Sequence, residues 1–204
     1  MGKQVLSARL VSLAISIFFI VLSHSVWAVS GIKRDFNELL GLSDLVLVGT
    51  VTAMESHWSD PVAQDNINTT ITLSDLQVLK GELNAEHYEV VIAGGSIPPY
   101  SVHIPGAPQF NLEKRYILFI KDNREVVFPF VGVHDGVFIV EALSQNQTQV
   151  KTLSGDIVTG IQGGEVQKVD KAHAKTFGGE SLSEEHFIEL VKQRLLEQSN
   201  QVSP

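Results

Sequence analysis

Cysteine is absent from this sequence of 204 residues. Its absence excludes disulfide bonds, thiolate metal sites and cysteine nucleophiles, so stability has to come from the burial of apolar side chains. Basic residues are also scarce, because 15 Lys and Arg stand against 23 Asp and Glu, for a formal net charge of −8. This acidic balance argues against nucleic acids and anionic membranes as partners, since both attract surfaces rich in Lys and Arg.

Catalytic signatures are missing as well. The sequence has no Gly-x-Ser-x-Gly elbow, no His-Glu-x-x-His motif, no phosphate-binding P-loop and no dinucleotide-binding glycine fingerprint. No two histidines have the spacing that brings two imidazoles to one metal on a strand or a helix. We therefore expect a non-enzymatic protein without catalytic residues, cofactor or metal. The alternative, a metal-dependent hydrolase, would use His103, His134 and Asp135.

Only the N-terminus contains a long hydrophobic run. Leu10 to Leu22 is almost wholly apolar, two basic residues precede it, and Val26 and Ala28 place small side chains at the −3 and −1 positions of a cleavage site. The run of about 13 residues is shorter than the roughly 20 needed to cross a bilayer. We predict that residues 1–28 are a signal peptide cleaved after Ala28, giving a periplasmic or extracellular protein without membrane contact.

Most of the remaining chain has the patterns of β-strands. Apolar or alternating runs predict strands at 44–55, 69–79, 87–93 and 113–122, the last of them the inner strand of the fold. We expect a bulge or a close backbone contact at Gly49, a bend near Ser74-Asp75, a hairpin over 126–140 that turns at Asp135-Gly136, and a weaker hairpin over 149–161. The fold class is therefore mainly β: a small, five- to seven-stranded antiparallel barrel, OB-like, over residues 29–161, with a sandwich as the alternative.

Helices are predicted at both ends of this β domain. Asp35 with Glu38 forms a capping pattern for a short N-terminal helix over 35–41. The Gly-, Lys- and Gln-rich stretch 162–180 is predicted to be a linker. Ser181 with Glu184 forms a capping box, and apolar residues at helical spacing follow, so the C-terminal helix is expected over 181–199.

One segment departs from ordinary loop composition. Gly94 to Phe110 carries several apolar side chains and no Asp, Glu, Lys or Arg, which is unusual for a loop on a protein surface. It could bind a protein partner or a small ligand across the mouth of a barrel, or it could fold back and close the end of that barrel. If it binds, the candidate partner-binding residues are Ile97, Tyr100, His103, Ile104 and Phe110.

The order of motifs also suggests a family. The motifs are Ser43 to Val51, Val78 to Glu82, Gly94-Gly95, Pro105 to Phe110 and Arg115 to Ile120. This order resembles a group of uncharacterised exported bacterial proteins with a small barrel, similar in outline to the oligonucleotide-binding-fold barrel of tissue inhibitors of metalloproteinases. The resemblance covers residues 35–141 and implies a fold and export more than an activity.

The resemblance has two departures. Where such proteins tend to open the last strand with a Gly-Glu pair, this chain has Leu112-Glu113-Lys114. Metalloproteinase inhibitors present a disulfide-bonded N-terminal cysteine to the catalytic zinc, which a chain without cysteine cannot do. The resemblance therefore implies, at most, a partner or modulator of an exported protease that acts by another mechanism.

Overall fold

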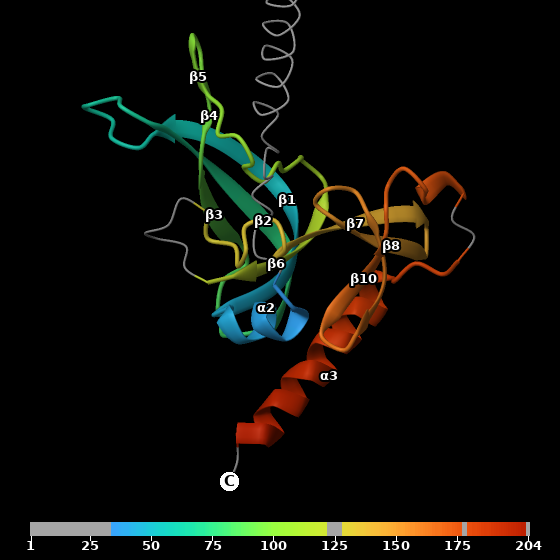
Figure 1. Ribbon diagram of the computed structural model, residues 1–204. Helices are drawn as coiled ribbons and strands as arrows, with labels where there is room; N and C mark the ends of the chain where they lie inside the picture. The colour runs from blue at the N-terminus through green and yellow to red at the C-terminus, as the bar shows by residue number, and fades with distance from the viewer. Residues whose placement is uncertain (1–33, 122–127, 177–178, 203–204) are drawn as a thin grey trace, which may run out of the picture. The chain divides into compact units, whose positions relative to one another are not determined.

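The computed structural model describes residues 34–121, 128–176 and 179–202 (Figure 1). The predicted signal peptide and its cleavage site lie outside these ranges. The elements follow in the order α2 (Phe36–Leu42), β1 (Leu45–Trp58), β2 (Ile67–Lys80), β3 (Tyr88–Ala93), β4 (Gly95–Ile97), β5 (Tyr100–Val102), β6 (Arg115–Ile120), β7 (Val137–Ser144), β8 (Gln147–Thr152), β9 (Ile157–Gln162), β10 (Glu165–Val169), the 3₁₀ turn η1 (Ala174–Thr176) and α3 (Glu184–Val202).

Eight of these strands form one antiparallel sheet in the order β10-β9-β8-β7-β6-β1-β2-β3, and β4 and β5 form a separate two-stranded sheet. The expected mainly β, antiparallel fold with a helix before and after it is confirmed. The closed barrel of five to seven strands is not confirmed, because no ladder joins β10 to β3 among the described residues. The successive hairpins from β7 to β10 lengthen the sheet at one edge, and an open sheet with two edges results.

Strand β6 lies between β1 and β7, so the prediction of an inner strand at this position is confirmed. All of its residues after Arg115 are buried. Side chains on alternate sides enter two different cores: Ile117 and Phe119 face the core shared with the helices, whereas Tyr116 and Leu118 face the core shared with β2 and β3. Burial on both faces explains why the sequence of β6 is continuously apolar.

Both helices pack on the same side of the sheet (Figure 1). The ring of Phe36 from α2 makes edge contacts, at centroid distances of 5.7 Å, with Phe119 of β6 and with Phe187 of α3. Helix α2 begins as predicted, because the Asp35 carboxylate accepts the Glu38 N–H at 2.7 Å. Among the described residues, no helix combines the length and the apolar character needed to cross a membrane.

Helix α3 begins two residues later than its predicted capping box implies. Ser183, not Ser181, is the capping residue, since its hydroxyl accepts the His186 N–H at 3.2 Å. The backbone of Leu182 is held in place beforehand: its carbonyl accepts from Val150 N and its N–H donates to Val158 O, both at 2.8 Å. These bonds to β8 and β9 keep the chain non-helical up to that point.

The long strands β1 and β2 are irregular at the positions that the sequence indicates. Gly49 has no partner in β2, and the register shifts between Val48 and Thr50, so the predicted bulge is confirmed. A β-carbon at Gly49 would lie 2.8 Å from the end of the Leu76 side chain and 3.2 Å from the Leu73 β-carbon, so a larger residue would require these neighbours to shift. The predicted bend at Ser74-Asp75 coincides with a positive φ of 52° at Asp75.

Two further predictions need correction. Asp135-Gly136 does not join two strands of a hairpin: β7 begins at Val137 and pairs with β6, while the residues before the turn make one bridge, Phe130 to Ile120. Residues 126 and 127, where the first strand of that hairpin was expected to begin, lie outside the described ranges. The stretch 162–180, expected to be a linker, contains β10 and η1. Strand β10 forms because it pairs with β9 over its whole length.

Candidate functional site

The uncharged segment 94–110 does not remain a simple loop. Its first part forms the β4–β5 hairpin, in which Gly95 pairs with Val102 and Ile97 with Tyr100. A cis peptide bond between Pro98 and Pro99 lies in the turn. The hairpin projects beyond the end of β1 and the start of β2 (Figure 1).

A chain of hydrogen bonds fixes the base of this hairpin to the main sheet. Ser96 N–H donates to Ser56 Oγ at 3.1 Å, the Ser56 and Thr69 hydroxyls bond at 3.1 Å, and Thr69 Oγ1 donates to Gly94 O at 2.7 Å. Because the single hydroxyl hydrogen of Thr69 goes to Gly94, Ser56 is the donor in the middle bond. Gly95 is required beside this chain, since a β-carbon there would collide with the Ser56 and Thr69 hydroxyls.

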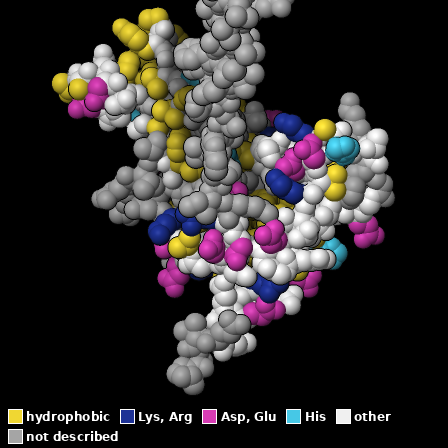
Figure 2. Space-filling model, viewed as in Figure 1, with side chains coloured by type: hydrophobic (Ala, Val, Ile, Leu, Met, Phe, Trp, Pro, Cys, Tyr) yellow, Lys and Arg dark blue, Asp and Glu magenta, His cyan; other side chains and the backbone are white. Residues whose placement is uncertain are grey.

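The end of the hairpin is apolar and exposed. Tyr100 is 59% exposed, and its ring contacts Trp58 of β1 edge-on at a centroid distance of 5.5 Å. Figure 2 shows hydrophobic side chains gathered on the hairpin. We call this surface the apolar tip, defined by Trp58, Ile97, Pro98, Pro99 and Tyr100.

The turn between β1 and β2 forms a second projection, which carries both hydrophobic and acidic side chains (Figure 2). Val62 at its end is 93% exposed. The turn nevertheless has a defined shape, because the Asp60 carboxylate accepts the N–H groups of Val62 at 2.7 Å and Ala63 at 3.0 Å. The bonds from Ala63 and Val62 hold the pKa of Asp60 below its ordinary value. Neither this turn nor segment 94–110 contains a Lys or Arg, and the turn carries two aspartates.

The five residues predicted to bind a partner divide into two groups. Tyr100 and His103 are exposed, Ile97 and Ile104 are half-buried, and Phe110 is only 7% exposed. The Phe110 ring packs against Tyr116 at 4.8 Å and Phe130 at 5.6 Å. The two alternatives for this segment, an exposed binding loop and a stretch that folds back, therefore apply to different parts of it. The hairpin projects into solvent, and the Phe110 end folds back into the core.

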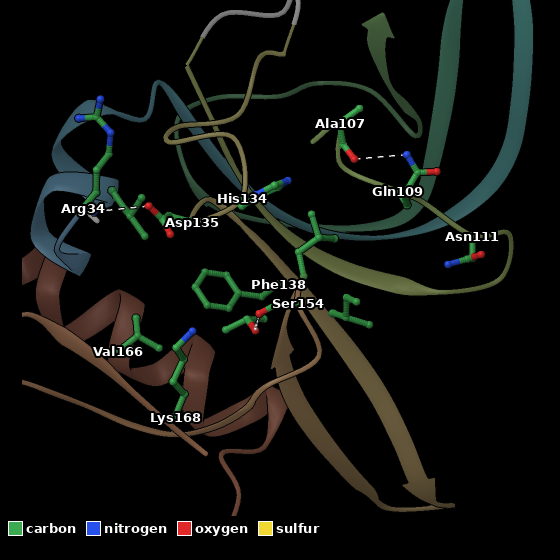
Figure 3. Close-up of a pocket in the computed structure, with 14 residues that line it drawn as sticks. Arg34, Ala107, Gln109, Asn111, His134, Asp135, Phe138, Ser154, Val166 and Lys168 are labelled. Atoms are coloured by element: carbon green, nitrogen blue, oxygen red, sulfur yellow. Dashed lines mark hydrogen bonds between the residues drawn. The ribbon is translucent and has the colours of Figure 1, made fainter. Parts of the chain in front are cut away.

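Two cavities adjoin the stretch that follows the hairpin, since Ala107 and Gln109 line both of them. The smaller, of about 310 Å³, lies at the base of the hairpin and includes His103, Ile104 and Phe110 among its lining residues. The larger has a volume of about 630 Å³. Its lining residues are Arg34, Leu39, Ala107, Gln109, Asn111, His134, Asp135, Phe138, Ile139, Thr152, Leu153, Ser154, Val166 and Lys168 (Figure 3).

One wall of the larger cavity is a polar network at the β8–β9 turn. Lys168 Nζ donates to Asp156 Oδ2 at 2.7 Å, Ser154 Oγ donates to the same oxygen at 3.1 Å, and Lys171 N–H donates to Oδ1 at 3.3 Å. The bond from Lys168, aided by those from Lys171 and Ser154, lowers the pKa of Asp156. The Asp156 carboxylate therefore has its hydrogen-bond partners within the protein and needs none from a bound ligand.

The residues of the metal-dependent alternative are not brought together. His134 and Asp135 line the larger cavity, whereas His103 lines the smaller one. The part of the chain that the structure describes contains no group of three or more His, Asp or Glu side chains placed to hold a metal ion.

The sequence indicated neither the larger cavity nor Trp58 of the apolar tip, whereas the other four residues of the tip belong to the uncharged segment 94–110. The cavity residues Leu153, Val166 and Lys168 come from β-strands and turns that have no distinguishing pattern. The aromatic Trp58 at the end of a strand, just before the polar loop, was the available signal for the tip. No significant match was found to a protein-family model, to a curated protein or to a solved structure.

Proposed function

We propose that this chain is an exported, non-enzymatic protein that binds another protein through the apolar tip. The observation that carries the proposal is Tyr100, which stands 59% exposed on a hairpin anchored at its base by hydrogen bonds. An exposed aromatic side chain on a fixed scaffold is the usual centre of a protein interface, because Tyr and Trp contribute much of the binding free energy there.

The anchoring supports a binding role because a surface that is already ordered loses little conformational entropy on association. Both the hairpin and the neighbouring β1–β2 turn have this property. A mobile loop of the same composition would lose more conformational entropy on binding.

The charges around the tip indicate the chemistry of the partner. The whole chain has a formal net charge of −8, and the β1–β2 turn beside the tip carries Asp60 and Asp65. This acidic chain would attract, at long range, a partner whose apolar groove is bordered by Lys or Arg. The positive charge of that groove would also repel basic proteins that compete with this chain. We therefore propose a basic protein surface as the partner.

The test is the substitution Tyr100→Ser, with Leu143→Ser as the matched control. Leu143, on β7, is 56% exposed and lies outside the apolar tip. Loss of a central aromatic contact typically costs about 2 kcal/mol or more, which is about thirtyfold in affinity. We expect Tyr100→Ser to abolish recovery of the partner with an unchanged melting temperature, and Leu143→Ser to retain the partner. A large loss of stability in Tyr100→Ser would show that the hairpin is part of the core.

The finer fold assignment is also a proposal. The strands β3, β2, β1, β6 and β7 share one core on the face opposite the helices, which supports a likeness to a small OB-type barrel in this part of the sheet. Modulation of an exported protease follows from that likeness alone. An inhibition assay against metalloproteinases and serine proteinases of the same compartment tests it.

A further inference from the structure

The larger cavity has the properties of a small-molecule site that the protein-binding proposal does not use. Its volume of about 630 Å³ is within the range of roughly 300–1,000 Å³ that is usual for ligand pockets. Phe138 forms part of its wall, and Ile139, Leu153 and Val166 are only half-buried although they are aliphatic. Apolar side chains that remain accessible inside a concave site favour an apolar ligand.

A cation with free hydrogen-bond donors lies at the edge of this apolar wall. In Figure 3 the Lys168 amine points toward Phe138 and Ser154. The ammonium group has three N–H donors, and one of them is bonded to Asp156. The side chain is 43% exposed, so the other donors are accessible.

The hydroxyl groups of Thr152 and Ser154 near Lys168 already donate their hydrogens within the protein. Ser154 Oγ donates to Asp156, so Thr152 Oγ1 donates to Ser154 and accepts the Asp156 N–H at 3.1 Å. These hydroxyls therefore hold the turn and leave Lys168 as the group on this wall that can recognise a ligand. An ammonium group with unused donors forms its strongest hydrogen bonds with an acceptor that carries negative charge.

We propose that the cavity binds an apolar monocarboxylate, with its hydrocarbon body against Leu153 and Val166 and its carboxylate on Lys168 Nζ. This site is separate from the apolar tip. Binding of the carboxylate and binding of the protein partner can therefore fail independently.

The test uses three probes with the same alkyl chain: decanoate, decanol and decyltrimethylammonium, each below its micelle concentration. Titration calorimetry on the purified protein should give saturable binding of one decanoate per chain, weaker binding of decanol and none of the cation. Tyr100→Ser should leave these affinities unchanged. Absence of saturable decanoate binding, or equal binding of decanoate and decanol, would overturn the proposal.

Two substitutions locate the site. Lys168→Gln should weaken decanoate about fivefold, equal to about 1 kcal/mol, and leave decanol unaffected. Its control is Lys151→Gln, because Lys151 also pairs with a carboxylate, that of Glu141, but does not line the cavity. Val166→Trp should fill the cavity and abolish binding of both probes. Equal effects of the two lysine substitutions would refute the assignment of Lys168, as would full affinity in a folded Val166→Trp variant.

Discussion

The substitution Phe110→Ala tests whether the uncharged segment ends in the core. Phe110 is 7% exposed, and its ring lies 4.8 Å from Tyr116 and 5.6 Å from Phe130. Truncation of a buried Phe to Ala removes the ring and leaves a cavity, at a typical cost of about 3–5 kcal/mol. Against a total stability of about 5–15 kcal/mol for an ordinary domain, this is a large fraction. We expect the melting temperature to fall by about 6–20 °C.

The assay is equilibrium unfolding in urea, followed by circular dichroism, for Phe110→Ala and Tyr100→Ala side by side. Tyr100 is exposed and belongs to the same uncharged segment, so its truncation should change the free energy of unfolding by less than about 1 kcal/mol. A loss below about 1 kcal/mol for Phe110→Ala would refute the reasoning, because the ring would then not contribute to the core. Equal losses for both variants would show that the segment unfolds and folds as one packed unit.

Two further predictions concern polar groups. Arg115 bonds Glu184 of α3 at 2.6 Å and is 23% exposed. Arg115→Met should therefore lower the free energy of unfolding, measured in urea, by about 2 kcal/mol, because Glu184 loses its partner. The control is Arg194→Met, because Arg194 and Glu197 form a more exposed pair within α3, with side chains 31% and 44% exposed; this substitution should change the free energy of unfolding by less than about 0.5 kcal/mol. Asp156 has a pKa lowered from 3.8, so its contribution is complete above that pH and is lost as the pH falls through the folded pKa. The stability difference between the wild type and Asp156→Asn, about 1 kcal/mol at neutral pH, should therefore vanish in acid, and an unchanged difference in acid would contradict this.

The central part of the fold was predictable because local pattern and burial agree there. The continuous apolar run of β6 demands burial on both faces, which only an inner strand provides. The cap at Asp35 and the bulge at Gly49 depend on neighbours that are close in the sequence or on the backbone itself. Such features can be predicted without knowledge of the tertiary structure.

The edges of the sheet were not predictable in the same way. Strand β10 has little hydrophobic pattern, and its strand conformation depends on pairing with β9. The start of α3 depends on Leu182, whose backbone bonds to Val150 and Val158 are tertiary contacts. Closure of the barrel likewise depends on which strands meet at the edges, which the pattern of each single strand does not determine.

The candidate sites likewise combine features that the local sequence predicts with features that depend on tertiary contacts. Composition alone indicated segment 94–110, because a long uncharged loop is unusual. It could not indicate that Tyr100 is exposed while Phe110 is buried, because both are aromatic residues in the same segment. The larger cavity brings together residues from Arg34 to Lys168, and this convergence is a property of the tertiary fold.

The most direct test of the central claim is site-specific photo-crosslinking in the native compartment. A photoreactive side chain is placed at Tyr100 in one variant and at Leu143 in another, two positions with nearly equal exposures of 59% and 56%. We expect one crosslinked protein from position 100 and none from position 143, with the crosslink suppressed by unlabelled wild type but not by unlabelled Tyr100→Ser. Identical crosslinks from both positions, or none from position 100, would contradict recognition through the apolar tip.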